Sequence, residues 1–450
     1  MSKDRILIIA IFTVSLGLRL TLCIINRGAN DDHLEVINRI VDKHEIPNKE
    51  DCWECFQPKL FYLIHAGIIN LLHIENPVHR RICVQLINFI FSFFLLVFLW
   101  KFIARQNFSP HIRVSCFALV ALNPCLTGIN VQATNDTLEI LAGVLVIYFA
   151  DLFFTEKNLS TGILMVVFTI LASLVKSSGI VILVALVMIF VLKLISSRPE
   201  NRRHLGTVFL ILLFSYFAIV PFAGDYYRNY QKYKTPFVHN HPHKDPPPDF
   251  FKRTYIQRPG ITSVMDGYFT FRYFDMIREP MITNGDENYP LHRTSLWSQL
   301  YGRTFFMHFD QWPPSWVSSD PNIRMAGRVL IILGIFPLLL FMAGFLKSIY
   351  RFFMSVKNNR KYYLSSGNDW MYLVFLSGFL LFIMKYTYDY RDFSTMKSIF
   401  IFPALPAFIK FYLNGFSLIN SGLLIRLLHF ITGAIVIFSL YDIGFLIGQL

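Results

Sequence analysis

Charged residues are scarce in this chain of 450 residues, because Asp, Glu, Lys and Arg together make up only 16% of it. Soluble domains usually carry about a quarter of such residues. Hydrophobic residues make up 54% and the mean hydropathy is +0.46, which excludes a soluble enzyme and a disordered chain. Cysteine is also sparse, with six residues, and this excludes a small protein built on disulfides. A helical membrane protein with many spans remains.

Acidic residues are outnumbered by basic ones, 29 against 42, which gives a formal net charge of +13. In a soluble protein this excess would suggest nucleic acid as a partner. The chain has no basic, aromatic-rich soluble module that could bind nucleic acid, and cytoplasmic loops of membrane proteins collect Lys and Arg. We therefore expect membrane lipid, and no nucleic acid, among its partners.

Long apolar runs recur from one end of the chain to the other, and no internal repeat accompanies them. A bilayer core of roughly 30 Å needs about 20 apolar residues in a helix. The sequence therefore predicts an all-α polytopic membrane protein with about eleven transmembrane helices. The runs lie at about 6–25, 82–104, 112–129, 137–155, 161–175, 178–195, 205–223, 325–346, 370–385, 398–413 and 423–447.

The segment 59–74 decides the topology, because every later loop changes side if it spans. It is short, and His65, Asn70 and His73 lower its hydrophobicity, which favours an interfacial helix. With this segment on the membrane surface, most Lys and Arg of the short loops fall in the cytoplasm; with it spanning, they fall outside. The positive-inside rule favours the first arrangement, so we expect a cytoplasmic N-terminus.

Three parts follow from this topology. Residues 1–223 form an N-terminal transmembrane catalytic module that includes the first outer loop, 26–80. Residues 224–324 form a long extracytoplasmic loop, which we expect to fold over the outer face as a lid. Residues 325–450 form the C-terminal transmembrane helices. In the first outer loop, apolar residues recur at helical spacing after Asp32 and predict an amphipathic helix that pairs with 59–74 at the interface.

Acidic residues stand at two outer positions. Asp31 and Asp32 follow the first apolar run, and Asp136 begins the fourth. Each could cap a helix, with Glu35 completing a capping box in the first case. A carboxylate at the membrane surface could equally be a base or a metal ligand, and Asp32 with Asp136 would be the metal ligands if a divalent ion is used. Capping and catalysis do not exclude each other.

Basic residues interrupt or flank the apolar runs on the same side. Lys176 breaks the stretch 161–195, and Arg391 and Lys397 flank an outer turn. A charge at the edge of hydrocarbon is costly and is often functional or paired. Lys and Arg at that depth suit a lipid phosphate; the alternative is that they snorkel to the headgroups.

Two weaker patterns remain open. Cys52 and Cys55 form a C-x-x-C that could be a local disulfide or two thiols. His239, His241 and His243 alternate in a Pro-rich stretch, where metal binding competes with a surface loop that carries incidental histidines.

Several motifs together resemble the polytopic glycosyltransferases of type C fold, most of all the branch that uses polyprenyl-phosphate-linked sugars, with protein O-mannosyltransferases and lipid A aminoarabinose transferases as relatives. The resemblance covers roughly 1–200 and 385–410. It rests on Asp31-Asp32, the segment Gln57–Tyr62, Arg81, Asn123-Pro124, Asn135-Asp136, the segment Leu174–Gly179, Pro403 and Pro406.

The resemblance implies an inverting transfer of a sugar from a polyprenyl- or dolichyl-phosphate donor to an acceptor hydroxyl on the extracytoplasmic face. It implies that Asp31 or Asp32 is the base and that Asp136 supports the site or a metal. The candidate residues for the donor phosphate are Lys59, Arg81, Lys176, Arg391 and Lys397, and those that position donor and acceptor are Gln57, Pro58 and Tyr62. Relatives often carry two consecutive prolines where this chain has Pro58 followed by Lys59.

A lipid, a glycan or a protein could be the acceptor. No organic cofactor is expected, and a divalent metal is left open. The bacterial inner membrane is favoured over the endoplasmic reticulum. The alternative function is a multi-pass transporter or flippase of a lipid-linked or small solute; a non-catalytic scaffold has no feature in its favour. A transporter would place ionisable residues at broken helices near the middle of its spans, whereas here they gather at the outer boundary.

Overall fold

The computed structural model describes residues 3–28, 30, 32–238, 266–281, 295–309, 316, 318, 320–357, 369–390 and 397–450. Within these ranges the chain is helical and contains no strand, which confirms the all-α class. Asp31, Arg391 and the three alternating histidines lie outside the described residues.

Nine helices in the described ranges are long and apolar enough to cross a membrane, which fits an integral multi-pass protein. The two other expected spans, 112–129 and 161–175, are shorter helices, so the expected count of eleven is not confirmed by length alone. The nine are α1 (Lys3–Ile25), α4 (Pro77–Ala104), α7 (Asp136–Glu156), η3 with α9 (Ser177–Gly179 and Ile180–Ser196), α10 (Pro199–Ala223), α16 (Pro321–Lys357), α18 (Asp369–Tyr390), η9 with α19 (Ser398–Ala404 and Leu405–Phe416) and α20 (Gly422–Gln449).

The run 112–129 is divided into two helices, α5 (Pro110–Ala121) and α6 (Pro124–Ile129). Proline has no backbone N–H and disfavours a helical conformation in the residue before it, so the helix stops before Asn123. The Asn123 side chain accepts a hydrogen bond from the Leu126 amide at 2.9 Å and donates one to the Thr304 carbonyl at 2.8 Å. These two hydrogen bonds hold the break between α5 and α6 in place.

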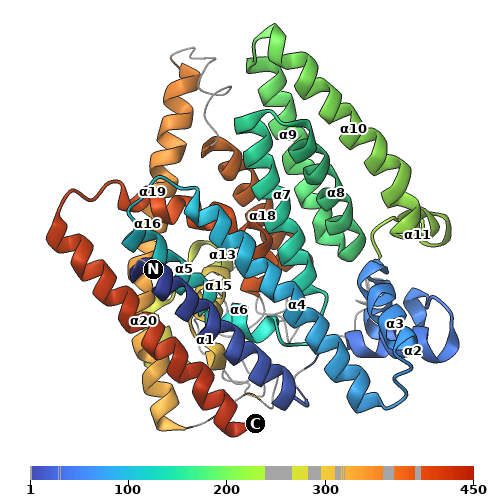
Figure 1. Ribbon diagram of the computed structural model, residues 1–450, viewed down its shortest axis with the longest axis horizontal. Helices are drawn as coiled ribbons and strands as arrows, with labels where there is room; N and C mark the ends of the chain where they lie inside the picture. The colour runs from blue at the N-terminus through green and yellow to red at the C-terminus, as the bar shows by residue number, and fades with distance from the viewer. Residues whose placement is uncertain are drawn as a thin grey trace.

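Polar contacts show which helix ends lie together. The Gln85 side chain, near the start of α4, donates to the carbonyls of Asn26 at 3.2 Å and Val131 at 3.1 Å. The Asn30 side chain accepts from the Ala133 amide at 2.7 Å. The segment after α1 and the segment after α6 therefore lie at the same end of the bundle. Figure 1 shows α2 and α3 beside this end, and we call it the α2–α3 end.

The segment 26–80, which the sequence predicts to be the first outer loop, contains the two expected helices, α2 (His33–Lys43) and α3 (Leu60–Leu71). The short 3-10 helices η1 (Lys49–Asp51) and η2 (Trp53–Phe56) lie between them. α2 buries one face, with Val36 and Ile37 fully covered, against Phe61 and Ile69 of α3. The same small apolar core includes Val84 of α4, Ala133 and Val175, so it holds the loop against the bundle.

The described part of the segment 224–324, for which the sequence predicts a lid, packs partly into the bundle. Its described helices are α11 (Tyr226–Tyr233), α13 (Asp266–Phe269), α14 (Tyr273–Arg278), α15 (Leu296–Phe305) and η6 (Met307–Phe309). α15 is buried against α6, α16 and η9, because its Leu296, Leu300 and Tyr301 join the apolar core. Figure 1 shows α13 and α15 among the long helices.

Candidate functional site

The first turns of α7 place two carboxylates side by side. Asp136 and Glu139 are three residues apart, so they share one face of the helix, and they are 5% and 1% exposed. The chain returns to this point through α8 (Leu159–Val175), which ends where Lys176 takes an extended conformation, φ −153° and ψ 146°. The break lets the Lys176 ammonium reach back to the carboxylates.

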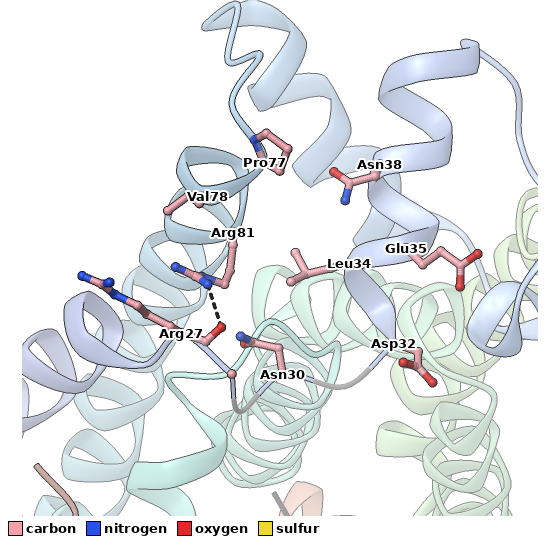
Figure 2. A pocket seen from close by; sticks show the side chains of 10 residues that line it. Arg27, Asn30, Asp32, Leu34, Glu35, Asn38, Pro77, Val78 and Arg81 are labelled. Atoms are coloured by element: carbon pink, nitrogen blue, oxygen red, sulfur yellow. Dashed lines mark hydrogen bonds between the residues drawn. The ribbon is translucent and has the colours of Figure 1, made fainter. Parts of the chain in front are cut away.

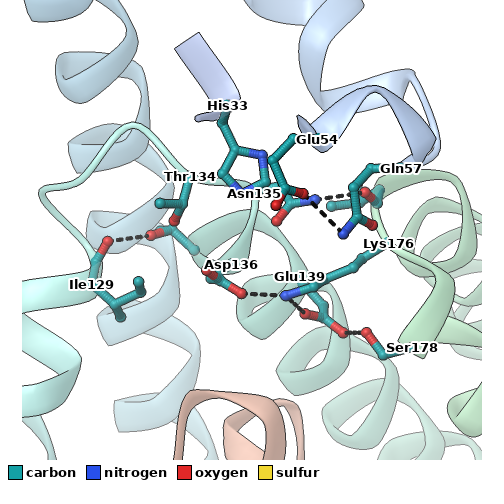
Figure 3. Close-up of polar contacts among 12 residues, drawn as sticks. His33, Glu54, Gln57, Ile129, Thr134, Asn135, Asp136, Glu139, Lys176 and Ser178 are labelled. Atoms are coloured by element: carbon teal, nitrogen blue, oxygen red, sulfur yellow. Dashed lines mark hydrogen bonds and ion pairs between the residues drawn. The ribbon is translucent and has the colours of Figure 1, made fainter. Parts of the chain in front are cut away.

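Lys176, Asp136, Glu139 and Ser178 form a buried network, which we call the Asp136 cluster (Figure 3). The Lys176 Nζ donates to Asp136 Oδ1 and lies 3.4 Å from Glu139 Oε2. The Ser178 hydroxyl donates to Glu139 Oε1, and the Phe400 ring lies 4.8 Å from the Lys176 Nζ. Two buried carboxylates thus share one ammonium, and loss of that ammonium would leave them uncompensated.

The first outer loop covers this cluster with polar groups. Figure 3 shows His33, Glu54 and Gln57 facing it. His33 Nδ1 lies 2.7 Å from the Tyr62 hydroxyl, and Gln57 Nε2 donates to Glu54 Oε2 at 3.3 Å. His33 is close enough to Asp136 to interact with it electrostatically. The predicted positioning residues Gln57 and Tyr62 therefore do lie near Asp136.

A disulfide between Cys52 and Cys55 closes η2, which settles the alternative left open by the sequence. Next to it, Pro58 is buried at the turn into α3. The Lys59 ammonium is 3% exposed and donates to the Cys55 carbonyl. Burial lowers the pKa of Lys59 to about 8. Lys59 is thus turned back onto its own loop.

Asp32 and Arg81 border an open pocket of about 380 Å³ between α2 and α4 (Figure 2). Arg81 Nη1 donates to the Arg27 carbonyl at 2.6 Å, and Figure 2 shows the Asp32 carboxylate turned away from Arg81. Asp32 is exposed and stands at the N-cap of α2 without a side-chain capping bond. Asp32 therefore does not form the capping box that the sequence left open as one alternative, and Glu35 pairs with Arg39 at 2.8 Å.

Two further cations, Lys397 and Arg303, belong to segments near the Asp136 cluster. Lys397, just before η9, interacts electrostatically with Asp136. Cys125 of α6 lies within electrostatic range of Lys397, Arg303 and Asp136. Arg303 of α15 is 7% exposed and donates to Gln299 Oε1 at 3.0 Å.

Asp136, Lys176 and Lys397 were predicted from the sequence, whereas other members of the site were not. The spacing of Asp136 and Glu139 at the start of an apolar helix was a usable signal for Glu139. No pattern in the sequence pointed to Arg303, because it lies in a segment without a recognisable motif. The missed residues are His33, Glu54, Glu139, Ser178 and Arg303.

The described His, Cys, Asp and Glu side chains do not fit a site for a divalent metal ion. In the described ranges no three His, Cys, Asp or Glu side chains come close enough together to hold an ion. The Asp136 carboxylate is already paired with Lys176, and Asp32 is exposed at the rim of the pocket. The described residues therefore give no basis for a metal-dependent step in a reaction at this site.

Compared with known protein families and curated proteins, the chain matches no family model and no curated sequence.

Proposed function

We propose that this protein is an inverting membrane glycosyltransferase that moves a sugar from a polyprenyl- or dolichyl-phosphate donor to an acceptor hydroxyl. The observation that carries the proposal is the convergence of ionisable groups at the α2–α3 end. Asp136 and Glu139 begin α7, Lys176 follows α8 and Lys397 precedes η9. The predicted first outer loop covers them (Figure 3). A charged site at one end of an apolar bundle suits a substrate with a charged head and a hydrocarbon tail.

The reaction needs one base and a cationic site. The base takes the proton from the acceptor hydroxyl, whose oxygen forms a bond to the anomeric carbon. The bond between that carbon and the phosphate oxygen breaks, and the lipid phosphate leaves with the electron pair and a larger negative charge. Cations that face this oxygen stabilise the transition state. A single displacement inverts the anomeric carbon and forms no glycosyl-enzyme.

Asp32 is the candidate base among the described residues, because its carboxylate is exposed and borders a pocket. Asp136 suits that role less, since its carboxylate is buried and already paired with Lys176. We assign Asp136, Lys176 and Glu139 to holding the site together. Lys397 and Arg303, together with the sequence-predicted Arg391, are then the candidates for the leaving phosphate.

The proposal includes eleven crossings, with the α2–α3 end outside the cytoplasm. α5 with α6 returns to the end where α1 stops, and α8 returns Lys176 to the start of α7, so we count each as a crossing. The disulfide Cys52–Cys55 at this end is typical of an oxidising compartment.

The test is transfer by the purified full chain. We would supply polyprenyl-phosphate-linked sugars and a membrane extract as acceptor, and measure by mass spectrometry the glycosylated product and the released lipid phosphate. Wild-type protein should yield both in equal amounts. D32N and D31N should express normally, and at least one should lose transfer.

The matched control is D42N. Asp42 lies at the other end of α2, exposed and paired with Arg80 at 2.7 Å, so its loss should leave transfer unchanged. Full transfer by both D31N and D32N would refute the assignment of the base. Absence of product with every donor offered would argue against the reaction itself.

Transport of a lipid-linked or small solute is the second candidate, and one observation favours it. The proposed crossing made by α5 and α6 is a discontinuous helix, broken at Asn123, as at many transporter sites. In proteoliposomes a transporter would move solute across the bilayer without forming a new glycosidic bond. The same product analysis separates the two functions.

A further inference from the structure

The helices α13 and α14 carry aromatic side chains that the protein leaves uncovered. Phe269 is 81% exposed and Phe274 is 82% exposed. The inner side of the same segment is packed: Met276 is fully buried, and the Phe271 ring lies 5.4 Å from the Tyr301 ring. The segment is therefore amphipathic, with an uncovered aromatic side.

Contacts with α16 place α14 at the edge of the apolar part of that helix. The apolar run of α16 starts after Arg328, whose Nη2 donates to the Arg278 carbonyl at 3.0 Å. The Tyr273 hydroxyl donates to the Ile332 carbonyl at 3.2 Å. Ile332 is four residues beyond Arg328, which is about 6 Å along the helix. The C-terminal end of α14 thus lies at the polar boundary, and its Tyr273 hydroxyl reaches one turn inside it.

Contacts with α18 also place this segment at the boundary between the apolar and polar parts of a long helix, independently of the contacts with α16. The Tyr268 hydroxyl donates to the Met384 carbonyl at 3.2 Å and lies 3.3 Å from Thr387 Oγ1. Met384 is the last residue of the apolar run of α18, and Lys385 follows it. The two contacts, on different long helices, place the segment at the same junction between apolar and polar surface.

The uncovered side of α14 continues a surface that a spanning helix presents to lipid. Along α16, Ile332, Leu339 and Leu346 are 42%, 57% and 56% exposed and recur every seven residues, as a lipid-facing stripe does. Tyr273, which contacts Ile332, packs against Phe274 with ring centroids 5.7 Å apart. Aromatic side chains are enriched at membrane interfaces, so lipid is the occupant that this continuity favours.

We propose that α13 and α14 form a re-entrant anchor that inserts Phe269 and Phe274 into the acyl-chain region of the leaflet at the α2–α3 end. The anchor is tied to α15 by two hydrogen bonds, from Trp297 Nε1 to the Tyr268 carbonyl at 2.6 Å and from the Arg272 amide to Ser298 Oγ at 2.7 Å. Lipid contact therefore holds the helix that carries Arg303. This inference does not depend on the proposed transferase activity.

The test is spin-label depth measurement on the full chain in phosphatidylcholine and phosphatidylglycerol bilayers. F269C and F274C are made in a background in which the four free cysteines, Cys23, Cys83, Cys116 and Cys125, are serine. Oxygen partitions into hydrocarbon and a nickel chelate stays in water. At both positions the label should be more accessible to oxygen than to nickel.

Two controls bracket the measurement. E45C, in the exposed part of the first outer loop, should be more accessible to nickel, and L339C on α16 should be more accessible to oxygen. Labels at 269 and 274 that behave like E45C would overturn the anchor in favour of an aqueous surface. Labels shielded from both reagents would overturn it in favour of a protein cover.

Discussion

At the residue scale, the Asp136 cluster makes a quantitative prediction for K176M. The substitution leaves the carboxylates of Asp136 and Glu139 buried without a counter-ion, and breaking one side of a buried pair typically costs about 3–5 kcal/mol. We expect a large loss of thermal stability in detergent. The triple variant D136N/E139Q/K176M should recover most of it, because no buried charge remains.

The matched control for this experiment is K157M. Lys157 is exposed and donates to the Asn201 side chain at 2.8 Å, so its removal should change stability by no more than about 0.5 kcal/mol. If K176M unfolded at the wild-type temperature, the two carboxylates would have to be neutral or solvated in the folded protein, and the cluster would not be an ion-paired network.

The buried Lys59 makes stability depend on pH in alkaline solution. Its pKa in the folded protein is about 8, below the ordinary 10.5, because burial disfavours the charged ammonium. Between about pH 8 and 10.5 the unfolded chain holds this proton and the folded chain does not, so stability rises with pH in that window. K59M should remove this contribution. The check is the melting temperature of both proteins from pH 7.5 to 10.

At the scale of elements, the position of η2 depends on its disulfide. η2 presents Glu54 and Gln57 to the Asp136 cluster, and Cys52–Cys55 closes its short turn. A loop of this size is stabilised by about 2 kcal/mol on the chain-entropy model. In C52S/C55S we expect faster hydrogen exchange at 52–59 and unchanged exchange in α7. Equal exchange in η2 with and without the disulfide would show that packing alone holds it.

The helices were predictable from the sequence because long apolar runs leave few alternatives, but their ends and contacts were not. Pro124 in the run 112–129 is a local signal for a break, yet only the contact between Asn123 and Thr304 shows what holds the corner. Asp136 was identified by its position, whereas its partner Lys176 is 40 residues away and meets it only through the fold. Arg303 depends on how α15 packs, which no local pattern specifies.

At the scale of the whole molecule, the number of crossings is the claim that most constrains the site. With eleven crossings, Glu45 in the first outer loop and Ser160 after α7 lie on opposite sides of the membrane. If α5 with α6 did not cross, Ser160 would share the side of Glu45. Both residues are exposed, so E45C and S160C, in a background without the four free cysteines, can each react with an impermeant maleimide.

We expect E45C to react in intact cells and S160C to react only after permeabilisation. The physical reason is that Gln85 binds the carbonyls of both Asn26 and Val131, so α5 with α6 must traverse the same distance as α1. Tyr227, in α11 and 48% exposed, adds a third position: Y227C should react like E45C. Reaction of S160C from outside would separate Asp136 from the first outer loop and remove the basis for a shared site.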